Sequence, residues 1–132
     1  MSSDIQTVSK GRLWAGRIIG GLPALFLLID AIMKFVKPAP VVEETVRLGY
    51  AESVIIGLGV VLLASTILYL IPKTSILGAI LLTGYLGGAV ATHVRMGEGW
   101  FPILFPVVFG GLLWAGLWLR DERLQNLIPL RG

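Results

Sequence analysis

The sequence contains no cysteine and a single histidine. Without cysteine the chain has no structural disulfide, CxxC redox pair, thiolate metal site or cysteine nucleophile. One histidine argues against a bound haem or zinc ion, because such sites normally take several imidazole or thiolate ligands. GxSxG, Walker and zinc signatures, and a GxGxxG motif after a strand, are also missing. We therefore expect no resident metal and none of the common chemistries of soluble enzymes.

Charged residues are scarce, at 14% of the chain, against roughly 25% in a typical soluble domain. Hydrophobic residues make up 55%, and the mean hydropathy is +0.84. Four apolar stretches fill most of the 132 residues: 13–35, 53–71, 76–94 and 101–119. Each is long enough to cross about 30 Å of hydrocarbon as a helix. The sequence therefore predicts an all-α membrane protein in a lipid bilayer, a single domain over residues 1–132 formed by a bundle of four transmembrane helices.

The links between these stretches are short. Residues 72–75 form a tight turn, so the second and third helices are expected to be antiparallel neighbours. The longer link after the first helix has Val42 and Val46 one turn apart, which predicts a short amphipathic helix on the membrane surface. The tail predicts an interfacial helix that ends at Pro129. We expect the first stretch to stay attached as a span, because no small-x-small signal cleavage site follows it.

Charge is distributed unequally between the two ends of the predicted bundle. The end that carries both termini holds seven basic residues: Lys10, Arg12, Arg17, Lys73, Arg120, Arg123 and Arg131. The other end holds four basic residues and five of the eight acidic ones: Lys34, Lys37, Arg47, Arg95, Asp30, Glu43, Glu44, Glu52 and Glu98. Because cytoplasmic ends carry the basic excess, we expect both termini in the cytoplasm, at a bacterial cytoplasmic membrane. Anionic lipid headgroups account for the net charge of +3, and we expect no nucleic-acid partner.

Glycine is abundant, with 17 residues. Small residues recur at four-residue spacing in three of the predicted helices: Gly16 and Gly20, Gly84 and Gly88, and Gly111 and Ala115. In lipid, such small faces let two helices approach closely. We interpret them as packing faces within one bundle; packing between subunits, in a homo-oligomer or against other membrane subunits, is the alternative.

Residues 70–124, LIPKTSILGAILLTGYLGGAVATHVRMGEGWFPILFPVVFGGLLWAGLWLRDERL, resemble the second half of DoxX-like membrane proteins. The first half is similar too, through GRIIGGLPALFLLIDAIMKF, the VVE stretch and GYAES, where relatives commonly have Gly-Tyr-Pro-Glu. The likeness extends from Gly11 to Leu130 and is most specific from Gly84 to Arg95. It implies a four-helix membrane bundle. The family is named after a subunit linked to thiosulfate oxidation with quinone as acceptor; other relatives are associated with membrane oxidoreductase complexes or resemble assembly chaperones, and a shared fold does not transfer a reaction.

Alternating helix directions bring five ionisable residues to one level of the membrane, at the end opposite the termini: Asp30, Lys34, Glu52, His93 and Arg95. Ionisable residues within spans normally face the bundle interior and have partners. Asp30 and Lys34 stand in the favourable i,i+4 order. Structural explanations remain open: Lys34 snorkels to the interface, the residues at helix ends complement helix dipoles, and Asp30 forms an ion pair that holds the first helix.

Tyr85, Gly88 and Thr92 share one face of the third helix and offer hydroxyls to a ligand, although threonines often bond to their own helix carbonyls instead. We assign Trp100, Phe101 and Phe105 to the aromatic belt at the interface. Together the polar residues predict a ligand-binding site: Asp30, Lys34, Glu52, Tyr85, Thr92, His93 and Arg95. A quinone or a lipid is the candidate ligand, and no residue is assigned a catalytic role.

Three functions fit these features. The chain is a quinone- or lipid-binding subunit associated with a membrane oxidoreductase system, or a non-catalytic assembly, chaperone or scaffold protein that uses its glycine faces. The third is a small-solute or proton-coupled carrier, which would have to act as an oligomer because four helices alone form no transport path.

Overall fold

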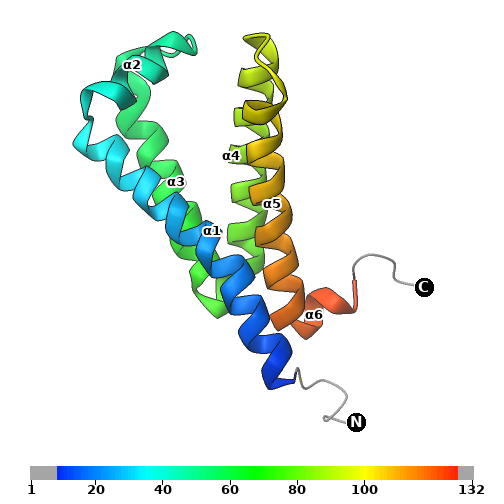
Figure 1. The fold of residues 1–132 in the computed structure, drawn as a ribbon. Coiled ribbons are helices and arrows are strands. Elements are labelled where there is room, and N and C mark those ends of the chain that lie inside the picture. The colour runs from blue at the N-terminus through cyan, green and yellow to red at the C-terminus, as the bar shows by residue number, and fades with distance from the viewer. Residues whose placement is uncertain (1–8, 128–132) are drawn as a thin grey trace.

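The computed structural model describes residues 9–127 and is built of helices (Figure 1). The helices are α1 (Lys10–Val36), α2 (Ala39–Arg47), α3 (Ile55–Leu70), α4 (Ser75–Arg95), α5 (Trp100–Arg120) and α6 (Glu122–Gln125), with 3₁₀ turns at Glu52–Val54 and Pro72–Thr74. Four helical segments, containing α1, α3, α4 and α5, are long and apolar enough to cross a membrane. The prediction of an all-α membrane protein with four transmembrane helices is therefore confirmed.

Each long helix packs mainly against two others. α1 and α4 each pack against α3 and α5, so the helices form a ring in the order α1, α3, α4, α5. α3 and α4 are joined by the predicted tight turn, where the Ser75 hydroxyl donates to the carbonyl of Tyr69 at 2.7 Å. Figure 1 shows the helices close together where α1 begins and α5 ends. We call this the terminal end; at the opposite, α2 end, α1 and α3 lean away from α4 and α5.

Glycine backbones make the close contacts at the terminal end. A Cβ atom on Gly116 of α5 would lie only 2.4 Å from the backbone nitrogen of Gly20 in α1. A Cβ atom on Gly78 of α4 would lie 2.2 Å from the backbone nitrogen of Tyr69 in α3. Tyr69 is fully buried, and its hydroxyl donates to the carbonyl of Leu113 at 2.5 Å. Packing of the Gly16–Gly20 face within the bundle is confirmed, since Gly16 also meets Gly116.

The other two small faces behave differently. A Cβ atom on Gly84, Gly88 or Gly111 would meet nothing within 4 Å. The interpretation of these three glycines as contacts within the bundle is therefore wrong. Gly84 and Gly88 lie at the level where α1 and α4 diverge, and both line a cavity.

The predicted surface helix is α2, which lies across the end of the bundle away from the termini (Figure 1). Lys37, with φ of 57°, turns the chain between α1 and α2. After α5, Asp121 caps the four-residue α6 by accepting from the backbone N–H groups of Arg123 and Leu124. The predicted continuation of this tail to Pro129 lies outside the described residues.

Candidate functional site

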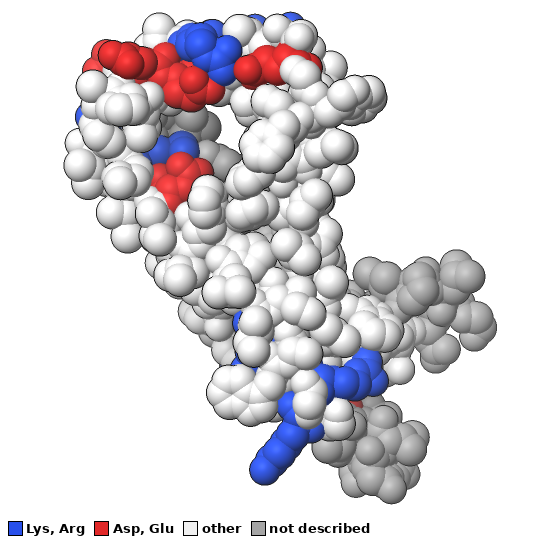
Figure 2. All heavy atoms as spheres, in the orientation of Figure 1, with Lys and Arg blue, Asp and Glu red and all other residues white. Residues whose placement is uncertain are grey.

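A cavity of about 480 Å³ lies at the α2 end, where the two helix pairs diverge. α1, α4 and α5 supply most of its wall, and residues of α2 and the loop after it close it toward that end: Glu44, Thr45, Leu48 and Tyr50. Figure 2 shows a hollow on the side of the molecule, with charged side chains inside it and a charged rim above. The volume lies in the range of small-molecule sites, about 300–1,000 Å³.

Three phenyl rings form the apolar wall between α1 and α5. Phe26 of α1 contacts Phe105 and Phe109 of α5 edge to face, with ring centroids 5.9 and 5.0 Å apart, respectively. Phe105 and Phe109, one helical turn apart, stack with centroids separated by 4.6 Å. All three rings line the cavity, so Phe105 does more than mark the membrane interface.

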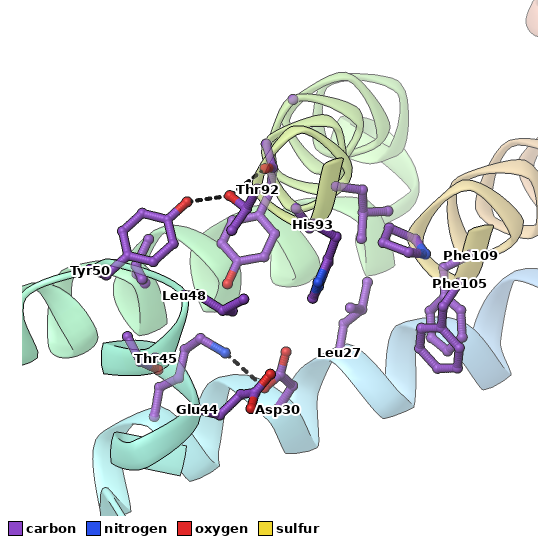
Figure 3. A pocket seen from close by; sticks show the side chains of 18 of the residues that line it. Leu27, Asp30, Glu44, Thr45, Leu48, Tyr50, Thr92, His93, Phe105 and Phe109 are labelled. Atoms are coloured by element: carbon purple, nitrogen blue, oxygen red, sulfur yellow. Dashed lines mark hydrogen bonds and ion pairs between the residues drawn. The ribbon is translucent and has the colours of Figure 1, made fainter. Parts of the chain in front are cut away.

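A charged pair from α1 lies inside the cavity. The ammonium Nζ of Lys34 is 2.8 Å from Oδ1 of Asp30. The Lys34 side chain is only 13% exposed, whereas that of Asp30 is 36% exposed. Figure 3 labels Asp30 of α1 and Glu44 of α2 among the residues that line the cavity, so both helices contribute an acidic group to its lining.

His93 of α4 also lines the cavity, and a chain of charged partners holds it. Its Nδ1 is hydrogen-bonded to Oε1 of Glu98, in the loop between α4 and α5. The other carboxylate oxygen of Glu98 accepts from Arg47 of α2 at 3.1 Å. Arg47 also donates to both oxygens of Glu44, at 3.0 and 2.6 Å. We refer to Glu44, Arg47, Glu98 and His93 as the rim network, since it links α2 to the end of α4.

The rim network shifts the acidity of its carboxyl groups. The hydrogen bond with His93, reinforced by the charge of Arg47, lowers the pKa of Glu98. The hydrogen bond from Arg47 likewise lowers the pKa of Glu44. Both carboxylates are therefore ionised at neutral pH and act as hydrogen-bond acceptors.

Two further contacts complete the closure. The hydroxyls of Tyr50 and Thr92 lie 2.6 Å apart, and Thr92 also bonds to the carbonyl of Gly88 in its own helix at 2.8 Å. Arg95 donates to the carbonyl of Leu48. The loop after α2 is thus fastened to the last turn of α4.

A sequence model of the DoxX-like family matches residues 18–116. The chain belongs to the DoxX-like family. The matched range includes every residue that lines the cavity. No curated protein and no solved structure matches this chain.

The cavity of this DoxX-like protein brings together five of the seven residues predicted as a ligand site: Asp30, Lys34, Tyr85, Thr92 and His93. The other two lie outside its lining. Glu52 faces Lys37 at 3.6 Å, and Arg95 is engaged with the carbonyl of Leu48. Whether the five residues bind a ligand stays a prediction.

Sequence reasoning missed the α2 side of the site and most of the phenyl wall. Glu44 and Tyr50 reach the cavity because α2 folds back over the bundle, and no pattern in the sequence specifies that path. Phe105 and Phe109 did carry a signal, because aromatic residues four apart share one helix face. Glu98 carried no such signal. It lies in the loop after α4, and no spacing in the sequence pairs it with His93 in the helix.

The site is suited to an amphipathic molecule. Among residues 9–127, no group of three or more His, Cys, Asp and Glu side chains could hold a metal ion. The cavity of the DoxX-like protein instead sets an ion pair, an imidazole and hydroxyls against three phenyl rings. Such an arrangement hydrogen-bonds a polar head group and packs against an apolar body.

Proposed function

We propose that this DoxX-like protein binds a lipid-like amphiphile, such as a quinone, in the cavity, and acts as a subunit associated with a membrane oxidoreductase system. The observation that carries the proposal is the division of the cavity into a phenyl wall and a polar wall within the membrane-spanning helices. An amphiphile dissolved in the bilayer has an apolar part that fits the phenyl wall and a polar head group that fits the polar wall. The chain has no cysteine, so redox chemistry would belong to the ligand or to a partner subunit.

We also infer the setting of the site. The terminal end carries the basic excess, which supports a bacterial cytoplasmic membrane with both termini in the cytoplasm. The cavity then lies in the leaflet far from the cytoplasm, and the rim network faces the extracytoplasmic surface.

Two neighbouring glycines of α4 provide the test. Gly88 lines the cavity and Gly87 does not, and a Cβ atom on either would meet nothing within 4 Å. The side chain introduced by Gly88→Leu therefore fills the cavity without a backbone clash, whereas that of Gly87→Leu is the matched control. Native mass spectrometry of gently extracted protein should show a bound quinone or lipid in the natural chain and in the control, and none in Gly88→Leu. Retention of the molecule by Gly88→Leu, or its absence from the natural chain, would refute binding in this cavity.

An assembly or scaffold role is the second candidate. It is favoured by the exposed Gly87 and Gly111, which pack against nothing among residues 9–127 and leave small surfaces open to another membrane helix. In this case Gly87→Leu or Gly111→Leu should release a copurifying chain while Gly88→Leu retains it. The two functions thus predict opposite results for adjacent glycines.

A further inference from the structure

The rim network fixes which nitrogen of His93 carries the proton. An ionised carboxylate only accepts hydrogen bonds, so Nδ1 of His93 must donate to Glu98. In the neutral imidazole the other nitrogen, Nε2, then has a lone pair and no proton. Among residues 9–127 the structure gives Nε2 no hydrogen-bond partner, and His93 points into the cavity in Figure 3.

Several hydrogen-bond donors in and around the cavity are already engaged. Lys34 donates to Asp30 at 2.8 Å, and Arg47 donates to Glu44 and Glu98. Tyr50 and Thr92 bond to each other. The hydroxyl of Tyr85 can donate or accept, so it favours neither donors nor acceptors in a ligand. The Lys34 ammonium keeps two of its three N–H groups for a ligand, but Nε2 of His93 only accepts, so a ligand that pairs with Nε2 must bring a donor.

We propose that the cavity selects amphiphiles whose head group carries a hydroxyl, which donates to Nε2 of His93. This inference rests on the proposed function and narrows the class of its ligand to hydroxyl-bearing head groups, such as a quinol, the reduced form of a quinone. His93 is the binding residue. Glu98 and Arg47 are positioning residues that hold its tautomer, in the way that a carboxylate orients an imidazole in other sites.

A pair of matched probes tests the selection: 4-dodecylphenol and its methyl ether, 4-dodecylanisole. They share the ring and alkyl chain, but the ether has no proton to donate. We expect the natural chain in lipid nanodiscs at pH 8 to bind the phenol about tenfold more tightly, the effect of one hydrogen bond in a half-buried site. His93→Ala should remove this preference and keep the affinity for the ether, which also shows that the variant is folded.

Glu98→Gln gives a sharper result than removal of the histidine. Arg47 should keep its bond to the side-chain oxygen at position 98, because a guanidinium only donates. The amide nitrogen then faces Nδ1 of His93 and donates to it, which moves the imidazole proton to Nε2. We expect the phenol-to-ether ratio to fall to about one, although the histidine is still present. The control is Glu52→Gln, a carboxylate at the same end that pairs with Lys37 outside the cavity, and its ratio should equal that of the natural chain.

The outcomes separate the inference from the proposed function. Equal binding of the two probes by the natural chain would overturn the selection by His93 and leave the lipid-like ligand in place. An unchanged ratio in Glu98→Gln would overturn the positioning role of the rim network. Failure of both probes to bind the natural chain would overturn the cavity as an amphiphile site, and the inference with it.

Discussion

The two ends of the bundle use the same residue types for opposite purposes. At the terminal end, glycines remove side chains so that helix backbones touch, as at Gly20 and Gly116. At the α2 end, Gly84 and Gly88 leave space that no neighbour fills, and the space is the cavity. Small residues in a membrane helix therefore indicate close packing only where the helices converge.

The cations differ between the ends as well. Arg12 and Arg120 of the terminal end lie over the rings of Trp118 and Tyr69, 5.1 and 5.0 Å from the centroids. At the α2 end, Lys34 and Arg47 instead contact carboxylates. Figure 2 shows red and blue together at that end, but mainly blue at the other. One end thus holds the helices together and is rich in basic residues, while the other maintains an organised polar cavity.

The largest expected effect comes from adding one methyl group at the terminal end. Gly116→Ala puts a Cβ atom 2.4 Å from the backbone nitrogen of Gly20, and a backbone cannot rotate aside as a side chain can. We expect α1 and α5 to separate and the free energy of unfolding to fall by about 3 kcal/mol or more. Gly84→Ala, at the other end, should change it by less than about 0.5 kcal/mol. Thermal unfolding in detergent compares the two, and equal losses would contradict the division between the ends.

The ion pair of the cavity should have the next largest effect. Asp30→Asn leaves the Lys34 ammonium, 13% exposed, without its counter-charge. We expect a loss of about 2 kcal/mol, below the range for fully buried pairs because Asp30 stays partly exposed. The double variant Asp30→Asn with Lys34→Met should recover most of the loss. Glu52→Gln, which breaks an exposed pair, is the control; a loss as large as that of Asp30→Asn would mean that burial does not set the cost.

The sequence was sufficient to predict the fold because the length of an apolar stretch is a local property. The four spans required only a count of apolar residues, and their ends agree with the structure within a few residues. Alternating helix direction brought Asp30, Lys34 and His93 to one level, and the shared helix face added Tyr85 and Thr92; all five line one cavity.

The rest depends on tertiary geometry that spacing does not encode. Gly16 and Gly20 have the same spacing as Gly84 and Gly88, yet the first pair lies where helices converge and the second where they diverge. Arg95 lies two residues beyond His93 but turns to a carbonyl of the α2 loop, because that loop passes beside it. The path of a loop over the bundle decides such partners, and neither periodicity nor charge order predicts it.

Two tyrosines at opposite ends provide a smaller test. Tyr69→Phe removes a hydrogen bond to Leu113 in a fully buried site, and we expect it to cost about 1 kcal/mol. Tyr50→Phe removes the bond to Thr92, but Tyr50 is 38% exposed and Thr92 keeps its bond to Gly88. Tyr50→Phe should therefore lower the free energy of unfolding by less than half as much as Tyr69→Phe, since water replaces part of the lost hydrogen bond. Chemical unfolding of both variants in the same detergent gives the ratio, and a larger loss for Tyr50→Phe would reverse the ranking of the two ends.

The smallest effect is a pH dependence confined to the α2 end. The pKa of Glu98 and that of Glu44 are lowered from an ordinary value of 4.5, so the rim network contributes its full stability above about pH 4.5 and loses it as the pH falls through the lowered values. Protonation of the two carboxyls therefore breaks the network and loosens α2, while the loop after it stays bonded to α4 through Tyr50 and Arg95.

The absence of cysteine makes this loosening measurable with spin labels on a cysteine-free background. Labels at the exposed Val46 of α2 and Trp100 of α5 should move apart or show a broader distance distribution as the pH falls below about 4.5. A control pair at Ile18 and Ala115, on the helices joined by glycine contacts, should not change, because no Asp or Glu side chain is among the atoms that Gly16, Gly20 and Gly116 meet there. Arg47→Gln should remove the pH dependence at the α2 end by breaking the network at every pH. A simultaneous change in both label pairs would instead indicate unfolding of the whole bundle, and would show that the two ends are not independent.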